Sequence, residues 1–274
     1  MNLEELVKFA LIEDVGSGDI TTEMLVDPLQ RGQAEVITRC EGVLSGCAPF
    51  NEVFRQVDKS LKVDWQKKDS DRFAQGDTIC HLNGSKSSIL TGERTALNFL
   101  GRLSGIATLT RAFVERVRGT NAVILDTRKT TPLLRKLEKD AVLHGRGSNH
   151  RFGLYDMILV KDNHESAGGG IGNVLKGLFA NNTIPTKVEV EVKTLEELQI
   201  ALQFNVDRIM LDNFSIDMIE EAVKSSGAKV PLEVSGGVTI DNISDIAATG
   251  VEFISIGALT HSAASIDFSL QMIS

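Results

Sequence analysis

Apolar runs of strand length recur along the second half of the chain, and amphipathic helix patterns separate most of them. The helical patterns cover Leu195–Phe204, Ile216–Ser225 and Ile240–Thr249. Strands that alternate with helices predict βαβ units and a parallel sheet. The predicted strands are Ala122–Leu125, Met157–Val160, Val188–Val192, Arg208–Leu211, Leu232–Val234 and Phe253–Ile256.

The first hundred residues follow a different pattern. Short strands are predicted at Val36–Thr38, Leu61–Val63 and Thr78–His81, with glycine-containing turns near them. Apolar residues then recur at helical spacing from Ser88 to about Arg118, which predicts one long helix. The glycines at 101 and 105 either interrupt this helix or permit close packing against it.

These patterns predict an α/β protein with two domains. We expect an N-terminal α+β sandwich domain over residues 1–105 and a β/α barrel domain, which carries the functional site, over residues 106–274. An eight-unit barrel takes about 250 residues. The second segment is shorter, so the barrel is predicted to be incomplete and open. The last residues are expected to pack back on the N-terminal domain.

Polar or glycine residues follow the carboxyl end of each predicted strand in the second half. Barrel enzymes carry their active sites at this rim. A polar loop end explains any single case, but six such ends in register indicate a common site. They are Asp126–Lys129, Lys161–His164, Glu191, Asp212–Asn213, Ser235–Gly237 and Gly257.

The segment from Lys187 to Lys193 alternates strictly between charged residues and valines. Period two places the charges on one face and the valines on the other. In a barrel the valines would pack against helices and the charges would point inward. Because an unpaired buried carboxylate is costly, Glu189 and Glu191 would need cationic or metal partners. The alternative is an edge strand with one face exposed to solvent. This is disfavoured because both faces of a parallel sheet are usually covered by helices.

The net charge of −8 argues against a general nucleic-acid binder. Against this acidic average, cationic residues gather between positions 128 and 164, which indicates a site for a small anionic ligand. Arg135, Lys136 and Lys139 also fit the charges of a solvated helix face. The cluster comprises Arg128, Lys129, Arg135, Lys136, Lys139, Arg146, Arg151 and Lys161, with His144, His150 and His164.

The cysteine spacing and the hydropathy of the chain argue against disulfides, a zinc site and a membrane span. The three cysteines, with no CxxC spacing, predict buried free thiols rather than a disulfide or a zinc site. No apolar run approaches the roughly 20 residues of a membrane span. The first residues also lack the features of a signal peptide. We therefore expect a cytoplasmic protein with neither membrane nor nucleic acid among its partners.

Glycine-containing turns follow the last two predicted strands, at Ser235-Gly236-Gly237 and Ile256-Gly257-Ala258. Barrel enzymes often bind phosphate at these positions, on backbone N–H groups at a helix N-terminus. Neither a Walker loop nor a GxGxxG followed by a helix is present, so nucleotide-binding folds of those types are disfavoured.

Over nearly its whole length the chain resembles the quinolinate phosphoribosyltransferase family (nicotinate-nucleotide pyrophosphorylase, carboxylating). Two positions depart from the family pattern, because Leu133 and Arg146 stand where the family commonly has glycine. The resemblance is carried by residues 13–22 (EDVGSGDITT), 92–100 (GERTALNFL), 103–108 (LSGIAT), 126–132 (DTRKTTP), 149–153 (NHRFG), 161–164 (KDNH), 189–192 (EVEV), 210–214 (MLDNF), 235–238 (SGGV) and 257–262 (GALTHS).

The resemblance implies phosphoribosyl transfer from phosphoribosyl pyrophosphate to quinolinate with decarboxylation. The products would be nicotinate mononucleotide, pyrophosphate and CO₂, in de novo NAD biosynthesis. Mg²⁺ would enter with phosphoribosyl pyrophosphate rather than being fixed by the protein alone. The expected assembly is a homodimer, and whether dimers assemble further stays open.

The same resemblance implies residue roles. Lys129, Lys161, Glu191 and Asp212 would be catalytic. Glu191 and Asp212 would face the ribose hydroxyls and Mg²⁺, Lys129 would bind phosphate or pyrophosphate, and His164 would stand behind the ligands. The quinolinate carboxylates would be held by Arg128, His150, Arg151 and Lys161, with Arg94 from the neighbouring subunit, and the 5′-phosphate by Ser235, Gly236, Gly237 and Gly257.

Three other functions remain possible at this point. One is the molybdenum-transport-associated homologue of the same fold, against which the intact Arg128-Lys129, His150-Arg151 and Lys161–His164 argue. Another is a phosphate-binding barrel isomerase or lyase, which would not explain so many cations. The last is a non-enzymatic module that binds an anion.

Overall fold

The computed structural model describes residues 1–180 and 186–273, which fall into two compact units that interleave along the chain. One unit comprises Met1–Arg111, Thr130–Arg146 and Leu259–Ser274, and the other comprises Ala112–Lys129 and Gly147–Ala258. The expected boundary at residue 105 thus lies inside one continuous helix, α4 (Lys86–Arg116). Two later segments also cluster with the N-terminal residues.

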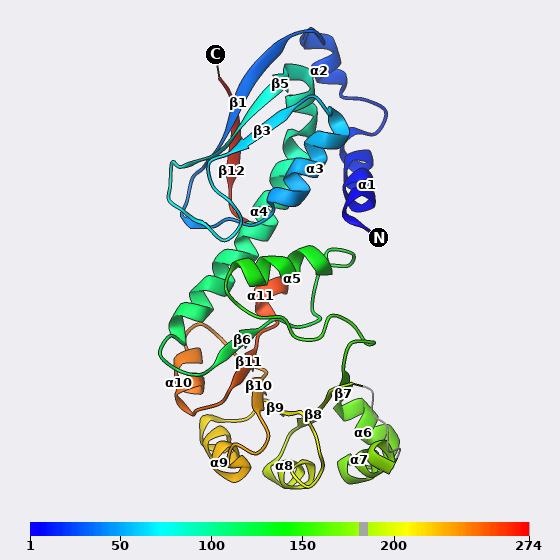
Figure 1. The fold of residues 1–274 in the computed structure, drawn as a ribbon, viewed down its shortest axis with the longest axis vertical. Coiled ribbons are helices and arrows are strands. Elements are labelled where there is room, and N and C mark those ends of the chain that lie inside the picture. The colour runs from blue at the N-terminus through cyan, green and yellow to red at the C-terminus, as the bar shows by residue number, and fades with distance from the viewer. Residues whose placement is uncertain (181–185, 274) are drawn as a thin grey trace. The chain divides into compact units, whose positions relative to one another are not determined.

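The first unit is built on a four-stranded antiparallel sheet in the order β12-β1-β5-β3. The final strand returns to this sheet, where Phe268 pairs with Thr38 and Ile273 with Gln33 (Figure 1). The elements of this unit besides α4 are α1 (Leu3–Val15), α2 (Ile20–Leu25), β1 (Arg31–Thr38), β2 (Gly42–Val43), α3 (Cys47–Val57), β3 (Lys62–Trp65), β4 (Arg72–Phe73), β5 (Thr78–Ser85), α5 (Arg135–His144), α11 (Ala258–His261) and β12 (Phe268–Ile273).

The two glycines of α4 permit close packing and do not interrupt the helix. A Cβ atom added at Gly101 would lie 2.6 Å from the carbonyl oxygen of Ile266. One added at Gly105 would collide with the carbonyl oxygen of Ala264. The segment before β12 therefore lies directly against the helix backbone, which only glycine allows at this distance.

The second unit is a six-stranded parallel sheet in the order β6-β11-β10-β9-β8-β7. This arrangement confirms the predicted open β/α barrel, and helices α7, α8 and α9 lie along one face of the sheet (Figure 1). The elements are β6 (Val123–Leu125), β7 (Ile158–Val160), α6 (Asp162–Gly168), α7 (Ile171–Ala180), β8 (Val188–Val192), α8 (Leu195–Ala201), β9 (Arg208–Asp212), α9 (Ile216–Ser226), β10 (Leu232–Ser235), α10 (Ile243–Ala248) and β11 (Phe253–Ser255).

Local sequence sets the ends of the outer helices. The side chain of Thr194 caps α8 by accepting from Glu197 N–H, and Ser215 caps α9 by accepting from Met218 N–H. Gly227 ends α9 in the left-handed conformation, with φ of 56°. Such caps satisfy donors and acceptors that the helix leaves unpaired, so each strand-to-helix turn begins at a defined residue.

The barrel is open between β6 and β7. In the part of the chain that the structure describes, each of these strands pairs with one neighbour only. The segment ahead of β7 lies along β6 instead, where Ser148 bridges to Leu125 and Ser148 N–H donates to the carbonyl of Ile124 at 2.8 Å. We call residues 147–151 the seam segment.

Cys40, Cys47 and Cys80 are all free thiols, as predicted, but only Cys80 is fully buried, and Cys40 and Cys47 are partly exposed. Burial raises the pKa of the Cys47 and Cys80 thiols, so the reactive thiolate form is disfavoured. None of the described helices is both long and apolar enough to cross a membrane.

Only some of the charged residues of α5 are exposed to solvent, although the sequence predicted exposure for Arg135, Lys136 and Lys139. Lys136 is exposed and pairs with Asp140 one turn later at 2.6 Å, as that pattern predicts. Lys139 is instead buried, at 1 % exposure, so its interpretation as a solvated charge was wrong. Glu138, also fully buried, accepts from Arg102 and from the hydroxyl of Thr131. The amphipathic pattern alone did not reveal that this face of α5 is covered.

Leu133 and Arg146 adopt left-handed backbone conformations, with φ of 68° and 70°. We expect Arg146→Gly to raise the free energy of unfolding by about 0.5–1 kcal/mol. The reason is that a left-handed L residue costs roughly 1–2 kcal/mol, more than the entropy cost of a glycine. Urea denaturation measures the change. Arg146→Ala is the control, because it removes the same side chain and keeps the Cβ; an equal gain in that variant would contradict backbone strain as the cause.

Candidate active site

The polar strand ends of the second unit meet at one rim of the sheet. Ser235 at the end of β10 is paired with Asp212 of β9 on one side and with Ser255 of β11 on the other. On the far side of β9, Glu191 of β8 is paired with Met210. Strand register therefore brings Glu191, Asp212 and Ser235 to neighbouring positions, as the sequence predicted.

Arg151 and Arg128 place two positive charges near one another. The pKa of Arg151 lies below its usual value, first because burial strips water from the guanidinium and then because Arg128 repels it. Glu189 and Asp156 offset this repulsion in part. The side chain of Arg151 is also fixed, since Nη1 donates to the carbonyl of Met157 at 3.1 Å. Like charges held together in a half-buried place form a site for an anion.

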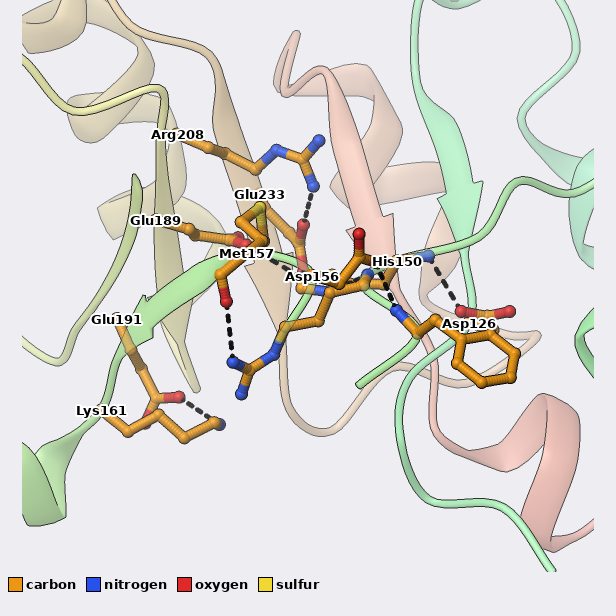
Figure 2. Close-up of polar contacts among 11 residues, drawn as sticks. Asp126, His150, Asp156, Met157, Lys161, Glu189, Glu191, Arg208 and Glu233 are labelled. Atoms are coloured by element: carbon orange, nitrogen blue, oxygen red, sulfur yellow. Dashed lines mark hydrogen bonds and ion pairs between the residues drawn. The ribbon is translucent and has the colours of Figure 1, made fainter. Parts of the chain in front are cut away.

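Lys161 and Glu191 form an ion pair at this rim, with Nζ 2.7 Å from Oε2 (Figure 2). The carboxylate of Glu191 is largely buried, so the predicted need for a cationic partner is met. Lys193 lies nearby. Its pKa is raised by the hydrogen bond to Asp162 and by the charges of Asp212 and Glu191. The rim therefore carries acidic and basic groups side by side.

The two predicted histidines are both engaged by the backbone. The ring Nδ1 of His164 accepts from Lys161 N–H at 3.0 Å. The ring Nδ1 of His150 accepts from Arg151 N–H at 2.7 Å, while His150 N–H donates to Asp126 Oδ1 at 2.9 Å. Each histidine thus accepts from the main chain of a predicted anion ligand, Lys161 or Arg151, and the predicted contact of His150 with quinolinate stays a prediction.

The turn Ser235–Gly237 has the backbone that a phosphate loop needs. Gly236 and Gly237 have φ of 91° and 62°. A Cβ on Gly236 would collide with the side-chain amide of Asn213, so this amide packs directly on the loop. On the other side, Asn242 Nδ2 donates to the carbonyl of Gly237 at 3.0 Å. Sequence analysis placed these glycines correctly but gave no role to either asparagine.

The remaining predicted residues lie as follows. Lys129 is exposed in the turn after β6, where its N–H donates to Thr127 Oγ1 at 3.1 Å. Gly257 follows β11 directly after Ile256. Arg94 belongs to α4 in the other compact unit, with a side chain that is 65 % exposed. Its predicted contribution across a dimer therefore stays a prediction.

Sequence analysis predicted that Glu189 points inward and needs a partner, but it missed Glu233 and Arg208 in the interior of the second unit. Glu233 of β10 and Glu189 of β8 are both fully buried and lie close to the ring of His150, and Arg208 reaches Glu233 from β9 (Figure 2). The available signal was a glutamate between two apolar residues, Leu232-Glu233-Val234, in a predicted buried strand. Such a residue is costly unless a partner is present.

Comparison with known proteins gives matches along most of the chain. Residues 19–104 match the family model "Quinolinate phosphoribosyl transferase, N-terminal domain", and residues 106–271 match its C-terminal domain counterpart. A curated relative from Bacillus subtilis, named "Probable nicotinate-nucleotide pyrophosphorylase [carboxylating]", is 40 % identical over 99 % of this chain and 94 % of its own length. The mitochondrial "Quinolinate phosphoribosyltransferase [decarboxylating] 2b" of Nicotiana tabacum is 39 % identical over 99 % of this chain and 82 % of its own length.

Solved structures give the same result. The structure of NadC from Streptococcus pyogenes superposes with a TM-score of 0.94 at 40 % identity, covering 99 % of this chain and 97 % of that one. The nicotinate-nucleotide pyrophosphorylase of Francisella tularensis has a TM-score of 0.91 at 42 % identity, covering 99 % and 96 %. Both likenesses extend over the two compact units.

We expect Gly236→Ala to lower the free energy of unfolding by about 2 kcal/mol or more, because φ is left-handed and the methyl group displaces Asn213. Gly237→Ala is the matched control. Its φ is also left-handed but no atom lies within 4 Å of the added Cβ, so its loss is expected to be about 1 kcal/mol. Chemical denaturation measures both, and equal losses would show that the Asn213 contact contributes nothing.

Proposed function

The chain belongs to the quinolinate phosphoribosyltransferase family, and we propose that it transfers a phosphoribosyl group to quinolinate with loss of CO₂. The donor in this proposal is phosphoribosyl pyrophosphate, and the products are nicotinate mononucleotide and pyrophosphate. The curated relatives carry this activity in their names. For this chain, the observation that carries the proposal is the strand register that brings Glu191, Asp212 and Ser235 together at the rim where Lys161 pairs with Glu191.

Quinolinate is a dicarboxylate on a pyridine ring, so it suits two guanidinium groups held close together. Guanidinium forks bind carboxylates in a bidentate manner and stay charged at every physiological pH. Burial lowers the pKa of Arg151 and repulsion from Arg128 lowers it further, and a bound carboxylate would offset that repulsion. In our proposal the carboxylates are bound by Arg128, His150, Arg151 and Lys161. His164 supports Lys161 by accepting from its N–H.

Phosphoribosyl pyrophosphate would lie across the neighbouring strands. The left-handed glycines at 236 and 237 expose backbone N–H groups that suit its 5′-phosphate, with Ser235 and Gly257 beside them. Glu191 and Asp212 would face the ribose hydroxyls, and Lys129 the pyrophosphate. The carboxylate oxygens of Glu191 and Asp212 are ligands of the kind that Mg²⁺ prefers. Bound with the substrate, Mg²⁺ would neutralise charge on the leaving pyrophosphate.

The reaction balances as follows. The pyridine nitrogen forms a bond to ribose C1 as the bond from C1 to pyrophosphate breaks, and positive charge builds on the sugar ring. The carboxylates at the rim stabilise that charge. The resulting pyridinium attracts the electron pair left at C2 when the adjacent carboxylate departs as CO₂. A proton then replaces CO₂ at C2, and a nearby cation such as Lys161 stabilises the transient carbanion.

The alternative functions have less support. A molybdenum-transport-associated homologue would have diverged at Arg128, Arg151 or Lys161, which are intact here. A phosphate-binding isomerase or lyase would not require two neighbouring arginines to bind a dicarboxylate. We also propose a homodimer in which Arg94 of one subunit completes the site of the other. Cytoplasmic location stays a prediction from the sequence.

The activity is tested by incubating the purified protein with quinolinate, phosphoribosyl pyrophosphate and Mg²⁺. Nicotinate mononucleotide and CO₂ are expected, and nicotinate in place of quinolinate should give no product. For Arg128→Ala we expect the KM for quinolinate to rise roughly 100-fold, because loss of a charge-assisted pair costs on the order of 3 kcal/mol. The KM for phosphoribosyl pyrophosphate should barely change. The control is Lys136→Ala, in the exposed pair on α5; a similar defect there would refute the specific role of Arg128.

The dimer proposal has its own test. Arg94→Ala and Lys161→Ala should each be inactive alone. After subunit exchange the mixture should recover roughly a quarter of the parent activity, since about half of the dimers are mixed and each mixed dimer has one intact site of two. Recovery of no activity from a mixture that does form mixed dimers would place Arg94 in the site of its own subunit, beside Lys161. Activity of Arg94→Ala alone would place Arg94 outside the site.

A further inference from the structure

Two asparagines contact the turn between β10 and α10, and the reaction described above uses neither of them. We call residues 235–242 the β10–α10 turn, which begins at Ser235, the last residue of β10, and ends before α10. Asn213 directly follows β9, the neighbour of β10 in the sheet. Asn242 is the last residue of the turn itself. The 5′-phosphate of phosphoribosyl pyrophosphate is assigned to this turn in the proposed function.

Three consecutive N–H groups of the turn have no hydrogen-bond acceptor among the residues that the structure describes. They belong to Gly236, Gly237 and Val238, which lie outside the helices and strands. Both glycines are exposed and have left-handed φ, of 91° and 62°. Successive N–H groups in a turn of this kind form a concave donor site for an anion. An anion can accept from all three only while the backbone of the turn keeps this conformation.

Asn213 contacts the turn through its main chain and its side chain. Its N–H donates to the carbonyl of Ser235 at 2.8 Å. Its side-chain amide occupies the space beside the α-carbon of Gly236, where an added Cβ would lie 3.0 Å from Nδ2 and closer still to Oδ1. Asn213 itself has φ of 57°, a conformation that asparagine adopts more readily than most residues. The chain therefore turns sharply after Asp212 and places the amide against the turn.

Asn242 contacts the turn from its other end. Its Nδ2 donates to the carbonyl of Gly237 at 3.0 Å, and its Oδ1 accepts from Thr239 N–H at 2.8 Å. Its own N–H donates to the hydroxyl of Thr239 at 3.3 Å. The side chain thus holds one carbonyl and one N–H group of the turn at the same time.

The two contacts determine the direction of two of the three N–H groups. The peptide units of the turn are trans and planar, so the N–H of each unit points opposite to its carbonyl. The carbonyl of Ser235 is held by Asn213, which directs the N–H of Gly236 away from Asn213. The carbonyl of Gly237 is held by Asn242, which directs the N–H of Val238 away from Asn242.

We propose that Asn213 and Asn242 are positioning residues that fix the β10–α10 turn for the 5′-phosphate of phosphoribosyl pyrophosphate. This inference rests on the proposed function, because the phosphate is assigned to the turn only there. The asparagines act through the peptide units of the turn and need not touch the substrate. Asn213 also follows Asp212, which is assigned to the ribose hydroxyls, so it connects the ribose contact with the phosphate contact.

A purely structural role is the other interpretation of the two asparagines. Asparagine side chains often hydrogen-bond to the main chain of a turn and stabilise it. Loss of such a contact would lower the free energy of unfolding without weakening one substrate more than the other. The two interpretations therefore differ in the KM values of the two substrates.

Asn242→Ala removes the hydrogen bond to the carbonyl of Gly237 without adding a charge. The KM for phosphoribosyl pyrophosphate should rise about tenfold, as expected when one hydrogen bond that orders a binding turn is lost. The KM for quinolinate should barely change. The matched control is Asn173→Ala, because Asn173 Nδ2 also donates to a glycine carbonyl, that of Gly169 at 2.9 Å, in a turn that carries none of the proposed ligands. Equal changes in both KM values, or the same change in the control, would overturn the proposal.

A double-mutant cycle tests the contact of Asn213 without reference to activity. Asn213→Gly removes the amide and keeps a residue that adopts left-handed φ freely. In that background the loss of stability caused by Gly236→Ala should shrink to the loss caused by Gly237→Ala, where nothing lies within 4 Å of the added Cβ. Urea denaturation measures all four variants. An undiminished loss from Gly236→Ala would show that the amide does not hold the turn.

Binding of ribose 5-phosphate, measured by calorimetry, separates this inference from the proposed function. Asn213→Gly and Asn242→Ala should each bind it about tenfold more weakly than the parent, and Asn173→Ala should bind it equally well. If the parent does not turn over quinolinate but shows this pattern, the proposed function fails and the positioning role stands. Absence of binding by the parent, or equal binding by the parent and both variants, would overturn the inference.

Asn242→Asp serves as the second variant should Asn242→Ala fail to fold. Its carboxylate still accepts from Thr239 N–H but cannot donate to the carbonyl of Gly237. The same selective rise in the KM for phosphoribosyl pyrophosphate is expected, and an unchanged KM would count against the proposal.

Discussion

Burial of charge inside the barrel is the constraint on which the second unit depends. Strand β8 presents valines to one face and glutamates to the other, so the sheet cannot be covered on both sides without enclosing carboxylates. Each enclosed carboxylate then requires a positive group or a proton. Glu191 finds Lys161 at the rim, and Glu189 meets His150 and Glu233 in the interior. The positions of Lys161 and His150 are thus tied to the pattern of one strand, and the anion site that we propose uses the cations near the rim.

Two histidines and a glycine of the predicted site also have structural roles. His150 and His164 each accept an N–H from the backbone at a basic residue of the site. Gly236 allows Asn213 to lie against the phosphate loop, and Asn213 itself has a left-handed φ of 57°. The residues that support the site are consequently close in sequence to the residues that form it, and a family motif contains both kinds without distinguishing them.

Much of the fold was predictable from the sequence because its signals are local. Period-two and helical spacing located the six strands of the second unit and helices α8, α9 and α10 to within a few residues, and the strand ends located the rim, but α6 and α7 were not predicted. Long-range facts were not predictable in the same way. Nothing local in Thr130–Arg146 indicates that it clusters with the N-terminal unit, and Lys139 looked like a solvated charge for that reason. Glu233 and Arg208 were missed because a buried charge is recognised by its partners, which come from other strands.

The seam between β6 and β7 has a consequence for how such a protein can change over evolution. A fully hydrogen-bonded barrel is closed by main-chain ladders that every sequence shares, whereas this one is closed by a short connecting segment and the side chain that it inserts. The contact across the open side of the barrel therefore depends on a few residues that can be replaced. A lineage could alter residues 147–151 and redirect the neighbouring cation toward a different acid, while the six strands and the glycine turns that we propose for phosphate stay as they are.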